Sequence, residues 1–176
     1  DVLARYYYAA KRNKSDIIIR ITSDCPLIDP FIMDKLTVSF LESKGIDYLA
    51  NIGGSRNKRT YPQGLDVEIF TFKALKKAFK EADEPQEREH VTPYFYFHPE
   101  RFNLKFIKSP VDYSKYRWTL DTPKDWKLIK EVYGRLYKGK HDFYFKNILE
   151  LFLKEPRLAK INARVKQKRL SLKYAD

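Results

Sequence analysis

Residues 16–22 read Asp-Ile-Ile-Ile-Arg-Ile-Thr, a short apolar run that decides the fold class of this 176-residue chain. β-Branched residues favour strands, and a run that is apolar on both faces is typical of a strand covered by two layers. We therefore predict a buried, central strand here. Arg20 lies inside the run, where a cation is costly unless it is paired. It is either a structural partner of a carboxylate or a contact to substrate.

Strands and helices alternate outward from this run. Residues 1–14 carry one apolar helical face. After a loop, Asp29 and Pro30 have the residue types of an N-cap and a first helical position, so a helix is expected to reach Lys44. The other expected strands are 46–50, 64–70, 103–108 and 116–120, and the other expected helices are 71–82, 85–98, 122–138 and 144–154.

The strand expected at 64–70 alternates apolar and acidic positions. Side chains two residues apart share a face, so Asp66 and Glu68 should lie together on one side of a half-buried strand. The alternation of strands with helices along the whole chain predicts an α/β domain built of layers.

Composition excludes several classes of protein. Hydrophobic residues make up 43% of the chain and charged residues 33%, a balance typical of globular proteins. No stretch approaches the ~20 apolar residues that a membrane span needs, so no membrane association is expected. One cysteine, Cys25, excludes an internal disulfide and a multi-cysteine zinc site, which fits a cytoplasmic location. Because the first residue is Asp1 rather than Met, we expect a fragment or a processed form.

The formal net charge is +12, and half of it comes from one short segment. Residues 157–176 carry seven Lys and Arg against one acid, so we divide the chain into a domain at 1–156 and a basic tail at 157–176. Basic chains with many aromatic residues can bind nucleic acid. The tyrosines fall mainly within expected helices, however, and no RNA-binding motif is present, so nucleic acid is not the expected partner.

Two carboxylates follow expected strands at positions suited to a metal site. Asp24 comes just after the 16–22 strand, and Asp121 comes just after the 116–120 strand. Ligands of open α/β sheets bind at the carboxyl ends of strands, and Mg²⁺ takes one or two carboxylates together with substrate phosphates. Either residue could instead form a turn or a cap, although Thr122 is the better N-cap and Asp125 completes a capping box with it.

Four segments resemble the cytidylyltransferase family, which includes the acylneuraminate and ketodeoxyoctonate activating enzymes, and especially its spore-coat polysaccharide branch. The likeness covers nearly the whole chain, including the stretch that begins at Lys160. Any one motif is modest support, but four in order are strong. The segments are Arg20-Ile-Thr-Ser-Asp24-Cys-Pro-Leu-Ile-Asp29-Pro, Arg59-Thr-Tyr-Pro-Gln-Gly64-Leu-Asp66-Val-Glu68, Arg88-Glu89-His90-Val-Thr92-Pro93-Tyr94 and Arg117-Trp118-Thr-Leu-Asp121-Thr-Pro.

The resemblance implies a Rossmann-like nucleotide-diphospho-sugar transferase fold, a three-layer α/β/α sandwich. It implies that CTP and a sugar are converted to a CMP-sugar and pyrophosphate for polysaccharide biosynthesis, with Mg²⁺ as cofactor. Asp24 and Asp121 would be the catalytic, metal-binding carboxylates. The remaining candidates would bind substrate. They are Arg20, Gly64, Asp66, Glu68, Arg88, Glu89, His90 and Arg117, of which Arg117 could instead pair with Asp66 or Asp112.

The chain departs from the family pattern at its start. The family opens with a strand and a Gly- and Arg-containing loop that holds the CTP phosphates, and no such loop occurs here. Gly53-Gly54-Ser55-Arg56 is the nearest string. We therefore expect an N-terminally truncated sandwich that is weakly active or inactive alone, with an unprotected sheet edge or an exposed apolar face.

Two further alternatives stay open. A nucleotide-sugar glycosyltransferase would also use strand-end carboxylates and a metal, but the Asp-x-Asp pair usual in that class is absent. The family resemblance also allows a homodimer, for which the aromatic segment 92–98 is a candidate interface, unless it is ordinary core.

Overall fold

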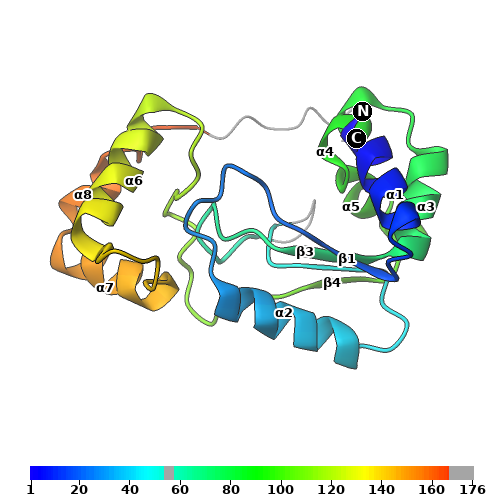
Figure 1. The fold of residues 1–176 in the computed structure, drawn as a ribbon, viewed down its shortest axis with the longest axis horizontal. Coiled ribbons are helices and arrows are strands. Elements are labelled where there is room, and N and C mark those ends of the chain that lie inside the picture. The colour runs from blue at the N-terminus through cyan, green and yellow to red at the C-terminus, as the bar shows by residue number, and fades with distance from the viewer. Residues whose placement is uncertain (54–57, 167–176) are drawn as a thin grey trace.

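A four-stranded mixed sheet forms the centre of the computed structural model, which describes residues 1–53 and 58–166. The strand order is β1-β3-β2-β4, and β3 runs antiparallel to both of its neighbours, whereas β4 runs parallel to β2 (Figure 1). The register pairs Ile19 with Ile69 between β1 and β3. The strands are β1 (Ile17–Arg20), β2 (Tyr48–Ala50), β3 (Glu68–Thr71) and β4 (Leu104–Phe106).

Helices cover both faces of this sheet. The helices of the described residues are α1 (Val2–Arg12), α2 (Pro30–Glu42), α3 (Phe72–Glu81), α4 (Pro85–His90), α5 (Pro93–Phe97), α6 (Pro123–Leu136), α7 (Phe145–Lys154) and α8 (Arg157–Lys160), with a 3₁₀ turn, η1, at Pro99–Arg101. Tyr48 and Phe70 belong to the core that the sheet forms with α1, α3 and α5. Leu49 and Ile69 belong to the core that contains α2. Alternation of side chains along each strand produces these two faces, and the result is the expected three-layer α/β/α arrangement.

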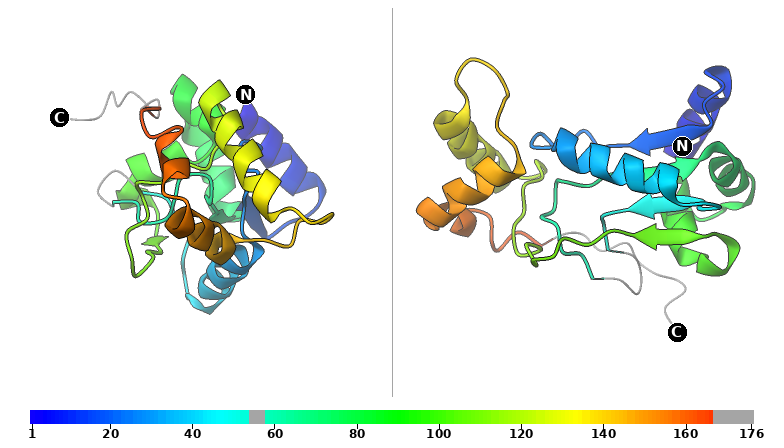
Figure 2. Two further views of the ribbon diagram at one scale, coloured as in Figure 1. Left: turned by 90° about the vertical axis from the view of Figure 1, so that its left-hand side faces the viewer. Right: turned by 90° about the horizontal axis from the view of Figure 1, so that it is seen from below.

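Helices α6, α7 and α8 pack together at one end of the sheet. Figure 2 shows this group opposite the end at which α3 and α5 lie. Ile129, Ile148 and Leu158, one from each of the three helices, join the same hydrophobic core as α2. Trp118 is fully buried in that core and stacks on Tyr116. The group therefore closes the end of the sheet at which β1 leads into the loop that contains Asp24.

Strand β1 lies at an edge, so the prediction of a central strand at 16–22 is wrong for the described residues. Its only ladder among them is with β3. Ile17 and Ile19 are 38% and 41% exposed, whereas Ile18 packs against the core. An apolar run indicates a strand whose two faces can be covered. It does not indicate whether both edges of the strand are paired, because pairing depends on residues far away in the sequence. The unprotected edge and the exposed isoleucines match the expectation for this sheet.

The strand expected at 64–70 begins only at Glu68, so Leu65 and Val67 lie in the segment that leads into β3. Strand β3 is central and buried rather than half-buried, contrary to the pattern of alternation. Leu65, Val67 and Ile69 are fully buried, and Glu68 is 3% exposed. The acid is accommodated because Arg20 pairs with it. The strand expected at 116–120 is not formed. In this segment, Arg117 makes an isolated parallel bridge with Gln63.

The helix expected at 85–98 is broken into two short helices. Val91 has φ 73° and separates α4 from α5. Pro93 then occupies the first turn of α5, where its missing N–H costs nothing. Local capping signals were reliable elsewhere, because Asp29 caps α2 and Thr122 forms a full capping box with Asp125.

The folded part of the chain continues beyond residue 156, where the basic tail was expected to begin. Leu158 of α8 is 2% exposed and Asn162 is 3% exposed. Residues 167–176, the rest of that predicted tail, lie outside the described residues, as do 54–57. In the described part of the chain, no helix is long and apolar enough to cross a membrane.

Candidate functional site

The segments that carry Asp24 and Asp121 lie side by side at the carboxyl end of β1. The backbone N–H of Leu120 donates to the carbonyl oxygen of Asp24 at 2.8 Å. Asp24 is half-buried, and the side chain of Asp121 is 43% exposed. The fold therefore places the backbones that carry two acids far apart in the sequence next to each other.

Arg117 anchors Asp121 to the body of the protein. Its Nη2 donates to Oδ2 of Asp121 at 2.6 Å, and its Nε donates to Oδ1 of Asp125 at 3.0 Å. Arg117 is 7% exposed and Asp125 is fully buried. The cation thus pairs with Asp121 and Asp125, rather than with Asp66 or Asp112.

Asp125 is held ionised by the groups around it. Burial acts to raise the pKa of its carboxyl, but hydrogen bonds from Arg117, Asn162 and Thr122 outweigh burial and lower that pKa below its ordinary value. The sequence identified Asp125 only as part of a capping box, and Asn162 only as part of the tail. Neither residue type nor spacing signalled that the two would meet.

Gly64 is required by a close approach of two backbones. Its φ is +96°, and a Cβ at this position would lie 2.6 Å from the carbonyl carbon of Trp118. The N–H of Trp118 donates to the carbonyl oxygen of Gln63 at 2.7 Å, which draws the two segments together. The loop that leads into β3 is thereby fixed against the segment that leads to Asp121.

Asp66 pairs with Arg59 beside Cys25. Two nitrogens of Arg59 donate to the two carboxylate oxygens of Asp66, in the fork geometry typical of arginine and carboxylates. Burial raises the pKa of the Cys25 thiol to about 12, and the charges of Asp66 and Asp24 act in the same direction. Asp24 and Asp66 therefore both lie near this thiol, which is protonated at neutral pH and donates to Oδ1 of Asp24 at 3.7 Å. Arg59 was not among the residues predicted for the site, although it lies in one of the four family-like segments.

Arg20 and Glu68 form a second ion pair, within the sheet. Arg20 donates to Oε1 of Glu68, and the hydroxyl of Tyr48 donates to Oε2. Burial lowers the pKa of Arg20, but the charge and hydrogen bond of Glu68, together with Tyr6 and Tyr48, leave that pKa raised. Burial and Glu68 both raise the pKa of Tyr48. Of the two readings of Arg20, the structure shows the carboxylate partner, and Glu68 is occupied within the protein.

Arg88, Glu89 and His90 lie apart from these residues. They belong to α4, which Figure 1 shows beside α1, at the other end of the sheet from α6. Arg88 pairs with Asp1 and donates to the carbonyl oxygen of Phe79 at 2.8 Å. Glu89 is exposed and His90 is half-buried. The structure does not bring this predicted group to the Asp24 neighbourhood.

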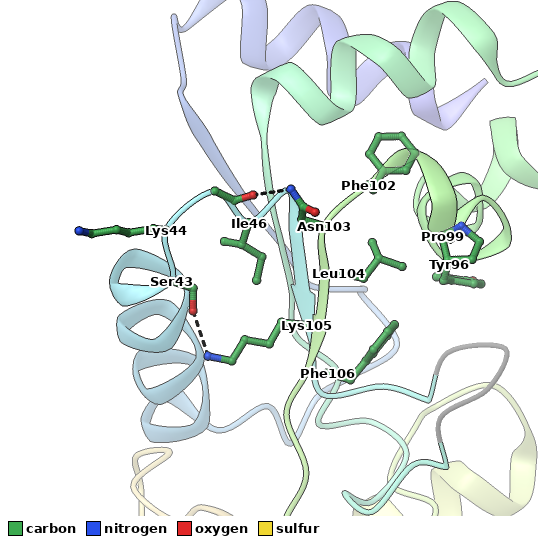
Figure 3. Close-up of a pocket in the computed structure, with 11 residues that line it drawn as sticks. Ser43, Lys44, Ile46, Tyr96, Pro99, Phe102, Asn103, Leu104, Lys105 and Phe106 are labelled. Carbon is green, nitrogen blue, oxygen red and sulfur yellow. Dashed lines mark hydrogen bonds between the residues drawn. The ribbon is translucent and has the colours of Figure 1, made fainter.

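A groove of about 810 Å³ lies along the outer edge of β4 (Figure 3). Its walls are the loop after α2, which includes Lys44, and the α5–η1 segment, which includes Tyr96 and Phe102. Lys105 spans one side and donates to Ser43 Oγ at 2.9 Å. None of the predicted site residues lines this groove. In the candidate dimer segment 92–98, Tyr94 and Phe95 are buried in the core.

A mixed sheet covered by helices on both faces is the architecture of the nucleotide-diphospho-sugar transferase fold found in cytidylyltransferases. Solved structures with this architecture are similar to the chain. A cytidylyltransferase from Leptospira borgpetersenii matches with TM-score 0.83 and 35% identity, over 97% of this chain and 68% of that one. A CMP:2-keto-3-deoxy-manno-octonic acid synthetase complexed with CTP matches with TM-score 0.53 at 11% identity, over 77% and 68% of the two chains, and supports the fold alone.

The chain belongs to the cytidylyltransferase family, whose family model, Cytidylyltransferase, matches residues 1–173. Uncharacterized protein MJ1063 from Methanocaldococcus jannaschii is 38% identical over 96% of this chain and 66% of its own length. Spore coat polysaccharide biosynthesis protein SpsF from Bacillus subtilis is 30% identical over 76% of this chain and 54% of its own length. The chain thus spans about half to two thirds of the curated relatives that it matches, and the expected family membership is confirmed.

Proposed function

We propose that the protein transfers the cytidylyl group of CTP to a sugar, giving a CMP-sugar and pyrophosphate. A sugar hydroxyl oxygen forms a bond to the α-phosphorus of CTP and loses its proton. The bond from that phosphorus to the oxygen that bridges it to the β-phosphorus breaks, and pyrophosphate leaves with that oxygen. Such a reaction depends mainly on positioning and on neutralising negative charge. The product would serve polysaccharide or cell-surface glycan synthesis, as the name of SpsF suggests for that relative.

The observation that carries the proposal is the junction between Leu120 and Asp24. It holds Asp24 and Asp121 on adjacent backbones, with Asp24 half-buried and the side chain of Asp121 43% exposed. Among residues 1–53 and 58–166, no group of three or more His, Cys, Asp or Glu could hold a metal ion. Two carboxylates fit the donor set of Mg²⁺, which prefers oxygen ligands and takes few of them from the protein. When bound, Mg²⁺ would neutralise the charge that develops on the phosphate oxygens.

Other residues in this neighbourhood shape the site. Asp66, held by Arg59, keeps 25% of its side chain exposed and can accept hydrogen bonds from sugar hydroxyls. Arg117 supplies positive charge next to Asp121. Glu68 is 4% exposed at its side chain, and we assign it to supporting the sheet with Arg20. The one cysteine, buried and protonated, is in keeping with a reducing cytoplasm.

Mass spectrometry of the products tests this proposal. The protein at its full natural length is incubated with CTP, Mg²⁺ and a pool of sugars, beside Asp24→Asn and Asp121→Asn. Asp142→Asn is the matched control, since Asp142 is an exposed aspartate that pairs with Lys140 and not with any of the candidate site residues. We expect a CMP-sugar with the wild type and the control, and more than about 100-fold less with either site variant. Equal product from Asp24→Asn and the control would refute the assignment.

A further inference from the structure

We propose that Asn162 and Asp125 are positioning residues that hold Asp121 in place through Arg117. The inference rests on the proposed function, because it concerns the metal-binding role of Asp121. It joins the C-terminal part of the described chain, which composition marks as a basic tail, to the candidate site.

Asn162 begins the chain of contacts. Its Nδ2 donates to Oδ1 of Asp125 at 2.7 Å and to the carbonyl oxygen of Arg117 at 2.9 Å. It is 3% exposed, so water does not replace these bonds readily. One amide therefore fixes both the carboxylate of Asp125 and the backbone of Arg117.

The two oxygens of Asp125 serve two purposes, and Oδ2 serves both, because it also accepts from Nη2 of Arg117 at 3.1 Å. Oδ2 accepts from the N–H and the hydroxyl of Thr122, both at 3.0 Å, and these bonds complete the N-terminal cap of α6. Oδ1 accepts from Nε of Arg117 at 3.0 Å and from Asn162. Capping does not require the contacts on Oδ1. Those contacts instead make the orientation of the guanidinium depend on Asp125 and Asn162.

Arg117 passes this constraint to Asp121. The same Nη2 that donates to Asp125 at 3.1 Å donates to Asp121 at 2.6 Å. Exposure rises along the series, from 0% at Asp125 and 7% at Arg117 to 43% at the side chain of Asp121. An exposed ion pair four residues apart orders a carboxylate only weakly. Anchoring Arg117 from its buried side gives Asp121 one preferred position. It also shares the charge of Arg117 with Asp125, so that Asp121 remains available to a cation.

Metal binding measures this coupling directly. Mn²⁺ alone is titrated into the full-length protein and into Asn162→Ala, and free Mn²⁺ is followed by electron paramagnetic resonance. We expect Asn162→Ala to bind Mn²⁺ about 10-fold more weakly, the size typical of losing a partner that orients a metal ligand. The Mg²⁺ concentration for half-maximal pyrophosphate release should rise by the same factor. Asn162→Ser, which keeps one donor, should lie between the two.

Asn51→Ala is the matched control. Asn51 is also a buried amide, 1% exposed, which donates to the carbonyl oxygen of Leu65 at 2.6 Å and touches none of the four residues in the series. It should lower the melting temperature, as Asn162→Ala does, and leave Mn²⁺ affinity unchanged. Equal affinity in Asn162→Ala and wild type, with both active, would overturn the positioning role alone. Absence of Mn²⁺ binding and of pyrophosphate release in the wild type would overturn the proposed function and this inference with it.

Discussion

Replacing Gly64 with alanine should destabilise the protein far more than the same change at Gly139. The two glycines have nearly the same backbone angle, with φ of +96° and +95°. They differ in their surroundings, because a Cβ at Gly139 would have no atom within 4 Å, whereas one at Gly64 would meet Trp118 and Thr119 at 2.6–2.8 Å. The pair therefore separates backbone strain from steric overlap.

The expected magnitudes follow from these distances. A side chain at such a φ costs about 1–3 kcal/mol, and the stiffer unfolded chain returns about 0.4–1 kcal/mol, so Gly139→Ala should lose about 1 kcal/mol. At Gly64 the overlapping atoms of Trp118 belong to the backbone and cannot rotate away. Overpacking of this kind adds about 1–3 kcal/mol. Gly64→Ala should therefore lose about 3 kcal/mol in total.

Urea denaturation of the wild type and both variants, followed by tryptophan fluorescence, measures the two free energies of unfolding. The m-values should be alike, so that the shift in midpoint reports stability. Losses that agree within about 0.5 kcal/mol would refute the reasoning. They would mean that the loop before β3 does not approach the segment that leads to Asp121 as closely as the structure shows.

Three further experiments test other parts of the structure. At pH 8, the Cys25 thiol, with its pKa raised to about 12, should react with a disulfide reagent about 1000-fold more slowly in the native protein than in urea; a fast native reaction contradicts its burial. Because the pKa of Asp125 is lowered on folding, its contribution is present above the unfolded pKa of about 4 and is lost as pH falls below that value. Asp125→Asn should thus flatten the loss of stability between about pH 4 and pH 2 in acid melts, and an unchanged slope counts against the network. Asp29→Ala removes the two hydrogen bonds that cap α2 and the acceptor for the N–H of Phe145. It should lower the free energy of unfolding by about 2–4 kcal/mol in chemical denaturation. Thr71→Ala, which removes the single cap bond of α3, should cost about 1 kcal/mol, and equal losses would contradict the link between α2 and α7.

Local signals in the sequence predicted local structure well. Asp29 and Thr122 cap helices as their residue types indicate, because an N-cap depends on the next three residues only. Pro93 also carried the signal that divides the 85–98 helix, although the apolar pattern across it was read as continuous. The place of each strand within the sheet was harder to predict, since an apolar run such as 16–22 is compatible with a central strand and with an edge strand.

For the candidate site, the sequence indicated which residues could take part better than it indicated which of them lie together. Asp24 and Asp121 were expected to converge because each follows a strand, and the junction between Leu120 and Asp24 places their backbones together. Arg88 was grouped with them on the strength of a motif, yet it lies at the other end of the sheet. Asn162 was overlooked because its partners are 37 and 45 residues away, beyond the reach of any spacing rule.

Nucleotide choice and metal dependence together test the central claim most directly. Pyrophosphate release is measured from CTP, UTP, ATP and GTP with a pool of sugars, with and without Mg²⁺, for the full-length wild type and Asp24→Asn. The account predicts Mg²⁺-dependent release from CTP alone, which falls more than about 100-fold in Asp24→Asn. Release from another triphosphate in preference to CTP, or release that is unchanged in Asp24→Asn, would contradict it.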